Sequence, residues 1–179
     1  LGITSIAIGN DHALASDENG NVWAWGQNGN GQLGQDTTDA KLKPVRVRNF
    51  DGTGVLEDIV EVSAGSNFSL ARTADGTVWA WGINSNYQLG DGTNTDRHLP
   101  VRTGGPGVSI EARRISAGNI HSLAILESGI VVGWGYNGNG QLASPVNGII
   151  PMPARDPSGA TLDRVSQVSA GSSHSLVLR

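Results

Sequence analysis

A tandem repeat is the feature that most restricts how this chain can fold. The segments IAIGNDHAL, VSAGSNFSL, ISAGNIHSL and VSAGSSHSL place Gly9, Gly65, Gly118 and Gly171 at separations of 56, 53 and 53 residues. A period of this length is typical of proteins that build one supersecondary unit after another. The 179 residues therefore form a single domain, 1–179, of three complete repeats and a partial fourth, which we place at about 6–61, 62–114, 115–167 and 168–179.

Several other residue types recur at the same step. Each complete repeat has a Trp-Gly pair, then Gln-Leu, then a proline; the recurring positions are Trp25, Trp81 and Trp134, Gln32, Gln88 and Gln141, Leu33, Leu89 and Leu142, and Pro44, Pro100 and Pro153. These positions belong to the framework of the repeat. The segments that differ between repeats are the places where a function specific to this chain can reside.

Each repeat contains four short segments that are typical of β-strands. In the second repeat these are IVEVSAG, FSLART, TVWAWG and LPVRT, separated by turn-forming residues. Asp75-Gly76 predicts a hairpin with a primed turn, and Asn19-Gly20 and Ser128-Gly129 occupy the same register. The 26 glycines suit tight turns better than helices. We expect an all-β fold, a β-propeller of four-stranded blades, with a β-solenoid as the alternative.

The segment GNGQLG at 29–34 matches the glycine pattern of a dinucleotide-binding loop. Its counterparts, SNYQLG at 85–90 and GNGQLA at 138–143, lose the glycines that close approach to a phosphate requires. The residues that follow, QDTTDAKLKP, contain turn formers and Pro44 where such a loop needs a helix. We therefore interpret GNGQLG as a repeated turn and expect no nucleotide cofactor.

The charge and hydropathy of the chain narrow the classes of partner. The formal net charge is −4 and the lysines and arginines form no cluster, which argues against nucleic acid as a ligand. No run of 18 or more apolar residues is present, so we expect no membrane-spanning segment.

The pattern SAGxxHSLA, then DGTVWAWGxNxxxQLGDGT, then Pro-Val resembles the regulator of chromosome condensation repeat. This resemblance implies a propeller, commonly of seven blades in full members of the family, and a role in protein binding for many of them. The third repeat departs from the pattern: Val132-Gly133 replaces Trp-Ala, Ala143 replaces a glycine, and the following loop is rich in proline.

The recurring histidines and tryptophans have a structural interpretation. His12, His121 and His174 share one register, but Phe68 fills it in the second repeat, which favours packing over a metal site. His98 lies outside this register, and we expect it on a loop. Alternation in TVWAWG makes both strand faces apolar, so we place the five tryptophans in the core between blades.

The segments after Gln-Leu-Gly, at 35–43, 91–99 and 143–152, differ most between repeats. Propellers present such loops at the rims of a rigid scaffold, so we predict that they bind a partner. The candidate residues are Asp36, Asp39, Lys41, Asp91, Asn94, Asp96, Arg97, His98 and Asn147. The aspartates lack the spacing of a calcium loop, and we interpret them as solvated turns rather than metal ligands.

No nucleophile with a base, and no distinctive carboxylate pair, is apparent in the sequence, so we do not expect an enzyme. The favoured hypothesis is a non-catalytic protein-interaction scaffold with an unknown protein partner. The resemblance also raises guanine nucleotide exchange on a small GTPase, the activity of the family's namesake. That activity would imply a protruding insertion and a basic tail, neither of which is evident here.

Three repeats and a fraction are too few for a closed propeller, which needs about four to eight blades. We expect either an excerpt of a longer array or an assembly of several copies. A self-assembling propeller fragment is thus a further hypothesis, with an interface formed by 1–14 and 165–179. The residues we assign to it are Ile6, Ile8, Val168, Leu176 and Leu178.

Overall fold

Fourteen β-strands and no helices make up the structure of the chain, a computed structural model that describes residues 2–105 and 107–179. Blade 1 contains β1 (Ile3–Ile8), β2 (His12–Asp17), β3 (Val22–Gly26) and β4 (Lys41–Arg46). Blade 2 contains β5 (Ile59–Ala64), β6 (Phe68–Thr73), β7 (Val78–Gly82) and β8 (Arg97–Arg102). Blade 3 contains β9 (Ala112–Ala117), β10 (His121–Leu126), β11 (Val131–Gly135) and β12 (Gly148–Pro153). Blade 4 has the two strands β13 (Gln167–Ala170) and β14 (Ser175–Leu178).

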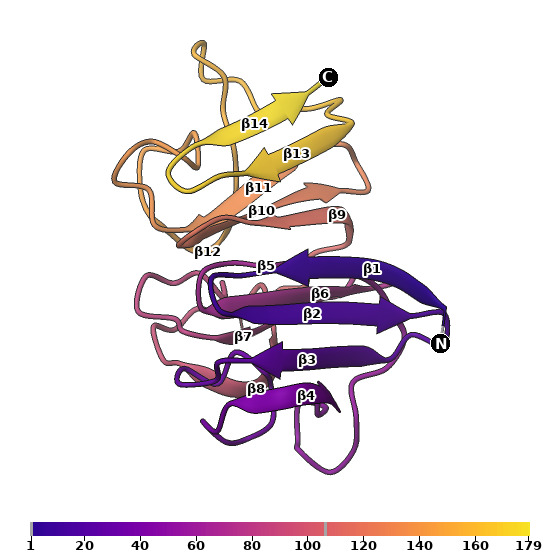
Figure 1. The fold of residues 1–179 in the computed structure, drawn as a ribbon. Helices are drawn as coiled ribbons and strands as arrows, with labels where there is room; N and C mark the ends of the chain where they lie inside the picture. The colour runs from indigo at the N-terminus through magenta and orange to yellow at the C-terminus, as the bar shows by residue number, and fades with distance from the viewer. Residues whose placement is uncertain (1, 106) are drawn as a thin grey trace.

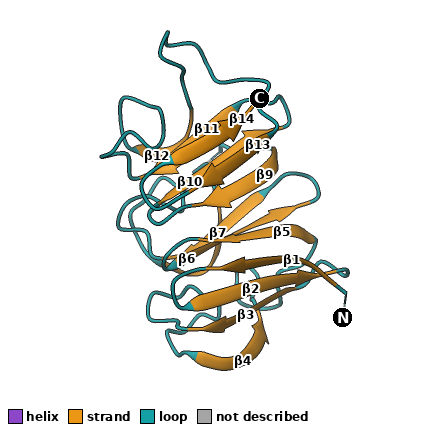
Figure 2. Cartoon of the chain, turned by 45° about the horizontal axis from the view of Figure 1, so that its top comes forward, coloured by secondary structure: helices purple, strands orange, loops and turns teal. Residues whose placement is uncertain are grey.

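Every blade is an antiparallel meander in which strands adjacent in sequence are paired in space. Blade 1 lies at one end of the stack, and β13 and β14 lie at the other (Figure 1). The blades follow one another face to face, as in an open segment of a propeller (Figure 2). The predicted four-stranded blades and partial fourth repeat are confirmed. No helix in the described ranges is long and apolar enough to cross a membrane.

The predicted hairpins form, but their turns are not of the primed type. Thr73 N donates to Thr77 O, and Gly76 N donates to Thr73 O, which encloses a three-residue loop. Gly76 has a φ of +87°, and Asp75 is not among the residues with positive φ. This is the pattern of a type I turn followed by one left-handed residue, which also matches the twist of a hairpin. The glycine carbonyl then accepts from Ala112 N of blade 3 at 2.9 Å.

The GNGQLG segment forms two successive turns, as predicted. Gly31 N donates to Asn28 O and Gly34 N donates to Gly31 O, and strand β4 follows without a helix. In blade 2 the position of Gly31 is occupied by Tyr87, which adopts the same left-handed conformation with a φ of +62°. The turn is therefore a property of the repeat and does not depend on that glycine.

The hydrophobic core lies between blades. Leu14, Ala24 and Leu33 of blade 1 pack with Ile59 and Trp81 of blade 2, and an equivalent cluster around Trp134 joins blades 2 and 3. Trp81 and Trp134 are fully buried, as expected. The expectation is wrong for Trp23 and Trp25, which are half-buried outside this core, and Trp79 is half-buried at the edge of the core.

Two different causes leave the three half-buried tryptophans accessible. In β3, Val22 and Ala24 face blade 2, so alternation turns Trp23 and Trp25 toward the outer face of blade 1. No sheet of the described chain covers that face. Trp79 lies at the edge of the core between blades 1 and 2, where Phe50 stacks on it and the Arg102 guanidinium lies 5.3 Å from its ring centroid.

A polar junction recurs between blades. The backbone carbonyl of Gln32 accepts from Ser69 Oγ and from Trp81 Nε1 of the next blade, both at 2.8 Å. The Gln88 carbonyl accepts from the corresponding serine and tryptophan of blade 3, Ser122 and Trp134, at 2.9 Å each. Each junction thus ties a turn of one blade to two strands of the next.

A buried histidine completes the junction of blades 1 and 2, and a second one makes the equivalent contact between blades 3 and 4. His12 Nε2 lies 3.0 Å from Ser69 Oγ, and His121 Nε2 lies 3.0 Å from Ser175 Oγ. Both imidazoles are buried, as is Phe68 in the same register of blade 2, which confirms the packing interpretation. The sequence prediction for His98 was wrong, because this residue lies in strand β8 and not on a loop.

Candidate functional site

The candidate interaction loops connect the third and fourth strands of each complete blade, and one asparagine organises each of them. Asn28, Asn84 and Asn137 accept at Oδ1 from the backbone N–H of Leu33, Leu89 and Leu142, at 2.9, 3.0 and 2.7 Å. Their Nδ2 groups donate to the carbonyls of Thr37, Thr93 and Ser144. The loops are therefore held in a common frame although their sequences differ.

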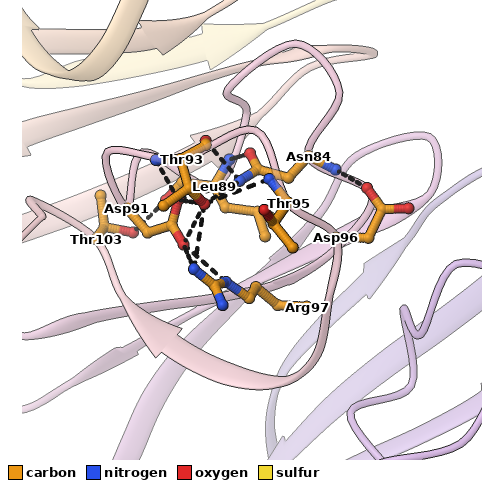
Figure 3. Close-up of polar contacts among 8 residues, drawn as sticks. All are labelled: Asn84, Leu89, Asp91, Thr93, Thr95, Asp96, Arg97 and Thr103. Carbon is orange, nitrogen blue, oxygen red and sulfur yellow. Dashed lines mark hydrogen bonds and ion pairs between the residues drawn. The ribbon is translucent and has the colours of Figure 1, made fainter.

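The blade 2 loop uses most of its charged groups internally (Figure 3). Asp91 is buried and accepts from Arg97 Nε at 2.8 Å and from the Thr93 backbone N–H at 3.0 Å. Asp96 Oδ1 accepts from the Asn84 backbone N–H at 2.7 Å. These three charged side chains shape the loop, and Asp96 and Asn94 are also exposed to solvent.

The blade 1 loop presents its acidic side chains outward. Asp36 and Asp39 are exposed, and Asp36 has a left-handed backbone with a φ of +59°. The Asp36 backbone N–H donates to the carbonyl of His98 in blade 2 at 3.0 Å. Lys41 does not belong to the loop, because it is the first residue of β4.

The His98 side chain is positioned by blade 1. A Cβ atom on Gly31 would lie 2.3 Å from His98 Cδ2, so the imidazole occupies space that only a glycine leaves open. His98 is thus half-buried between two blades. Nothing in the spacing of the histidines indicated this contact, because it joins positions that are not equivalent in the repeat.

The blade 3 loop is the most apolar of the three. Asn147 is exposed, and its Oδ1 accepts from the Asn137 backbone N–H at 2.8 Å, in the manner of Asp96 in blade 2. Val146 and Ile149 are exposed beside it. These two apolar residues were not among the sequence candidates, although the replacement of aspartate and threonine by proline, valine and isoleucine in this repeat indicated them.

The three loops form a continuous rim. The backbone bond from Asp36 to His98 joins loop 1 to β8, and Gly92 N donates to Ile149 O of β12 at 3.3 Å in the equivalent place. Along this rim the exposed side chains change from acidic in blade 1 to mixed polar and acidic in blade 2, and then to largely apolar in blade 3. The structure therefore brings Asp36 and His98 together, while Asn94 and Asn147 stand on separate loops.

The buried Ser-His pairs have a geometry opposite to that of a catalytic dyad. Ser69 donates its hydroxyl proton to the Gln32 carbonyl, so His12 Nε2 must be the donor to Ser69 Oγ. The Nδ1 of His12 is buried and has no partner in the described chain. Desolvation by burial lowers the pKa of His12 to about 4, and the same cause lowers the pKa of His121 to about 4.

A shallow cavity of about 360 Å³ lies where the inner loops meet. Its lining includes Gly9, Gly65, Gly118 and Gly171, the four glycines that reveal the repeat. Backbone bonds from Asn10 N to Ser66 O and from Ser66 N to Asn119 O, both 3.2 Å, link successive loops. The cavity therefore belongs to the inter-blade framework. Within the described residues, no group of three or more His, Asp or Glu side chains is arranged to hold a metal.

Stacked four-stranded blades, a Trp-to-Gln link between them and divergent loops along one rim define an open propeller segment of the tandem-repeat class. A family model of the regulator of chromosome condensation (RCC1) repeat matches residues 19–72, 75–125 and 128–178. A second model with the same description matches residues 3–32, 59–88 and 112–141. The chain belongs to the RCC1 repeat family.

Comparisons with individual proteins agree with this assignment. The chain is 37% identical over 154 residues to RCC1 domain-containing protein RUG3, mitochondrial, of Arabidopsis thaliana, covering 79% of this chain and 32% of RUG3. It is 34% identical over 181 residues to the ultraviolet-B receptor UVR8 of the same plant, covering 98% of this chain and 39% of UVR8. The chain thus spans less than half the length of either protein.

A solved structure shows the same fold. Yeast RCC1 (Prp20), in its complex with Kap60, superposes with a TM-score of 0.75 at 26% identity, over 98% of this chain and 41% of Prp20. Another structure of Prp20 was described with its binding properties to Gsp1p and histones. Proteins of this fold therefore include ones that bind protein partners.

Proposed function

We propose that the chain is a non-catalytic protein-interaction scaffold that binds a protein through the rim formed by loops 35–43, 91–99 and 143–152. The observation that carries this proposal is that the three loops have the same internal hydrogen bonds but different exposed residues. Asn28, Asn84 and Asn137 hold the loops in the same way, yet the exposed residues differ in charge and polarity from blade to blade. A pre-organised, chemically varied surface suits selective binding because little ordering entropy is lost.

Two relationships support a protein as the ligand. Prp20 of the same fold has been solved with the protein Kap60, and the chain described here has a net charge of −4, which disfavours a phosphate backbone. Within the proposed rim, we assign different roles to the candidate residues on the basis of their contacts. Asp36, Asp39 and Asn94 are available to a partner, while the side chains of Asp91 and Arg97 stabilise the loop.

Affinity purification from cells of the source organism, with quantitative mass spectrometry, tests the rim. A triple variant, Asp36→Ala with Asp39→Ala and Asn94→Ala, should lose its specific partners because it removes exposed groups and leaves the asparagine frame intact. The matched control replaces three exposed residues away from the rim: Asp51→Ala, Glu57→Ala and Glu127→Ala. Loss of the same partners from the control, or their retention by the rim variant, would contradict the proposal.

A nucleotide-release assay separates the scaffold from an exchange factor. The chain is added to a small GTPase loaded with a fluorescent guanine nucleotide, and the release rate is compared with the spontaneous rate. We expect no acceleration. Acceleration that is lost in the triple rim variant would show that the rim catalyses exchange, and the non-catalytic part of the proposal would be wrong.

Self-association is a second candidate, and the exposed apolar residues at the ends of the stack favour it. Ile6 and Ile8 are 71% and 77% exposed in β1, and Leu176 and Leu178 are 65% and 55% exposed in β14. Val168 differs, because it packs against the cluster formed by blades 3 and 4. Light scattering over a dilution series tests this candidate: a mass of twice 18.6 kDa or more supports assembly, and a monomer at all concentrations excludes it.

A further inference from the structure

A small groove opens between blades 1 and 2, at the end of the strands opposite to the rim. Its volume is about 280 Å³, and its walls come from the connection between β4 and β5, the turn between β6 and β7, and strands β7 and β8. In an antiparallel meander these connections and the loops between β3 and β4 lie at opposite ends of the strands (Figure 1). Both walls belong to complete blades. A further blade would stack on blade 1 or on blade 4, because each repeat contacts only its neighbours, and it would not fill this junction.

Two aromatic rings line the groove. Phe50 stacks on Trp79, with 6.1 Å between the ring centroids and 19° between the ring planes. The Phe50 side chain is nevertheless 62% exposed. The segment that carries it is closed by a β-bridge between Arg48 and Val55, which fixes its position beside blade 2. The groove therefore presents a fixed aromatic surface to solvent.

Carboxylates outnumber cations in this groove. Asp58 and Asp75 are exposed in it, together with Glu57 and one guanidinium, that of Arg102. Glu57 has a partner of its own, because its Oε1 lies 3.8 Å from Arg46 Nη2. Asp58 takes part in no ion pair within the described residues. The groove thus has an excess of negative charge.

The turn between β6 and β7 holds the Asp75 carboxylate in place. Its Oδ1 accepts from the Thr73 hydroxyl and from the Thr77 backbone N–H, the latter at 3.0 Å. The hydrogen bond from the Thr73 side chain, followed by that from the Thr77 N–H, lowers the pKa of Asp75. The carboxylate is therefore ionised at neutral pH and contributes its charge to the groove.

The junction of blades 2 and 3 has other residues in the equivalent positions. The replacements are Val132 for Trp79, Ser128 for Asp75 and Ile110 for Glu57. The aromatic and acidic groove is thus a property of one junction and not of the repeat framework. Residues that differ between repeats are the ones that can serve a function specific to this chain.

A guanidinium is the group that suits both the rings and the carboxylates. Its plane stacks on aromatic faces, and its N–H groups pair with carboxylate oxygens. The chain itself uses this contact twice, with the guanidinium of Arg102 at 5.3 Å from the Trp79 ring centroid and that of Arg46 at 5.9 Å from the Trp23 ring centroid. The groove is smaller than the clefts of roughly 300–1,000 Å³ that enclose drug-sized ligands, which favours one long side chain. A neutral ring would leave the carboxylates without a counter-charge.

We propose that the groove between blades 1 and 2 binds an arginine side chain of a partner protein, with the guanidinium stacked on Phe50 and paired with Asp58 and Asp75. The site does not rest on the rim proposal, because the rim lies at the other end of the strands. Either surface can therefore fail its test without affecting the other.

The test uses three peptides with blocked ends: Gly-Ser-Arg-Ser-Gly and its versions with lysine or citrulline in place of arginine. Each is titrated into the ¹⁵N-labelled chain and followed by NMR. We expect saturable 1:1 binding of the arginine peptide, with shifts at Phe50, Asp58, Asp75 and the Trp79 indole N–H. Citrulline has the shape of arginine without its charge, and its peptide should bind at least about tenfold more weakly. The lysine peptide should be intermediate, because it keeps the charge and loses the planar fork.

A charge-removing variant locates the site. Asp58→Asn with Asp75→Asn should weaken binding of the arginine peptide at least about tenfold. The fold should persist, because asparagine accepts the same hydrogen bonds and tolerates the left-handed backbone of Asp58, whose φ is +62°. The matched control, Asp36→Asn with Asp39→Asn, also includes a left-handed aspartate, at a φ of +59°, and lies on the rim. This control should bind the peptide normally.

A second variant tests the aromatic surface. Phe50→Ala should weaken binding of the arginine peptide about threefold, because it removes the stacking contact. Leu42→Ala removes another exposed apolar side chain, on β4, and should have no effect. Equal affinity for the arginine and citrulline peptides, a lack of saturable binding, shifts that map outside the groove, or self-association of the chain that is lost in Phe50→Ala would each overturn the proposal.

Discussion

The strands β3 and β7 have the same sequence, VWAWG, but different surroundings. Trp81 of β7 is fully buried and donates to the Gln32 carbonyl of blade 1. Trp25, its counterpart in β3, is half-exposed on the outer face of blade 1. Identical side chains in identical strands thus contribute differently to stability. The contribution depends on whether a neighbouring blade covers the tryptophan and supplies the carbonyl that accepts its hydrogen bond.

Replacement of each tryptophan by alanine is the strongest test of this comparison. Trp81→Ala should lower the free energy of unfolding by about 3 to 5 kcal/mol, since it leaves a cavity between two blades. Trp25→Ala should lower it by about 1 kcal/mol or less, because half of that ring already contacts water. Urea unfolding measures both, and equal losses would contradict the dependence on a neighbouring blade.

The histidine junctions should make stability depend on pH. Because the folded-state pKa of His12 and of His121 is lowered to about 4, the unfolded chain binds more protons between about pH 6.5 and pH 4. Stability is therefore complete above pH 6.5 and decreases as the pH falls through that window. At pH 5 the loss is up to about 2 kcal/mol for each histidine.

The variant His12→Phe tests the contribution of His12 to this pH dependence. Phenylalanine is a suitable replacement because Phe68 already occupies this register at the junction of blades 2 and 3. We expect it to remove about half of the loss of stability between pH 7 and pH 5, measured by urea unfolding at both values. A variant with unchanged pH dependence would show that other groups dominate the titration.

The loop asparagines should divide into framework and surface residues. Asn84→Ala should lower the free energy of unfolding by roughly 1 to 2 kcal/mol, because it leaves the buried Leu89 N–H without its acceptor. Asn94→Ala, on the same loop, should change it by less than about 0.5 kcal/mol. Thermal unfolding of both variants measures the difference, and a larger effect at Asn94 would be inconsistent with the loop as described.

The smallest expected effect concerns the serine of the junction. Ser69→Ala removes the hydroxyl between His12 and the Gln32 carbonyl and should cost about 1 kcal/mol. The reciprocal change, Ala13→Ser, adds the hydroxyl in the same register of blade 1 and should have no measurable effect, since no carbonyl of the described chain faces it. Stabilisation by Ala13→Ser would point to an assembly that covers blade 1.

The sequence predicted the elements more reliably than their surroundings. The spacing of Gly9, Gly65 and Gly118 led to the repeated blades, and Asp75-Gly76 located a hairpin whose turn type was wrong. Lys41, Arg97 and His98 were assigned to loops but begin fourth strands. In the candidate site, Asp91 looked available to a partner, yet it is buried and paired with Arg97. Sequence divergence alone does not distinguish a loop residue that stabilises the loop from one that faces solvent.

By itself, the sequence determined the family of the chain, its β-propeller blades and the loops that vary between them. These properties follow from local patterns: alternation within strands, glycines that permit left-handed turns, and a repeat that every blade shares. Only the tertiary structure decided which tryptophans are buried and which aspartates are exposed. Burial and hydrogen-bond partners are set by contacts between blades, and such contacts join residues that no local pattern relates.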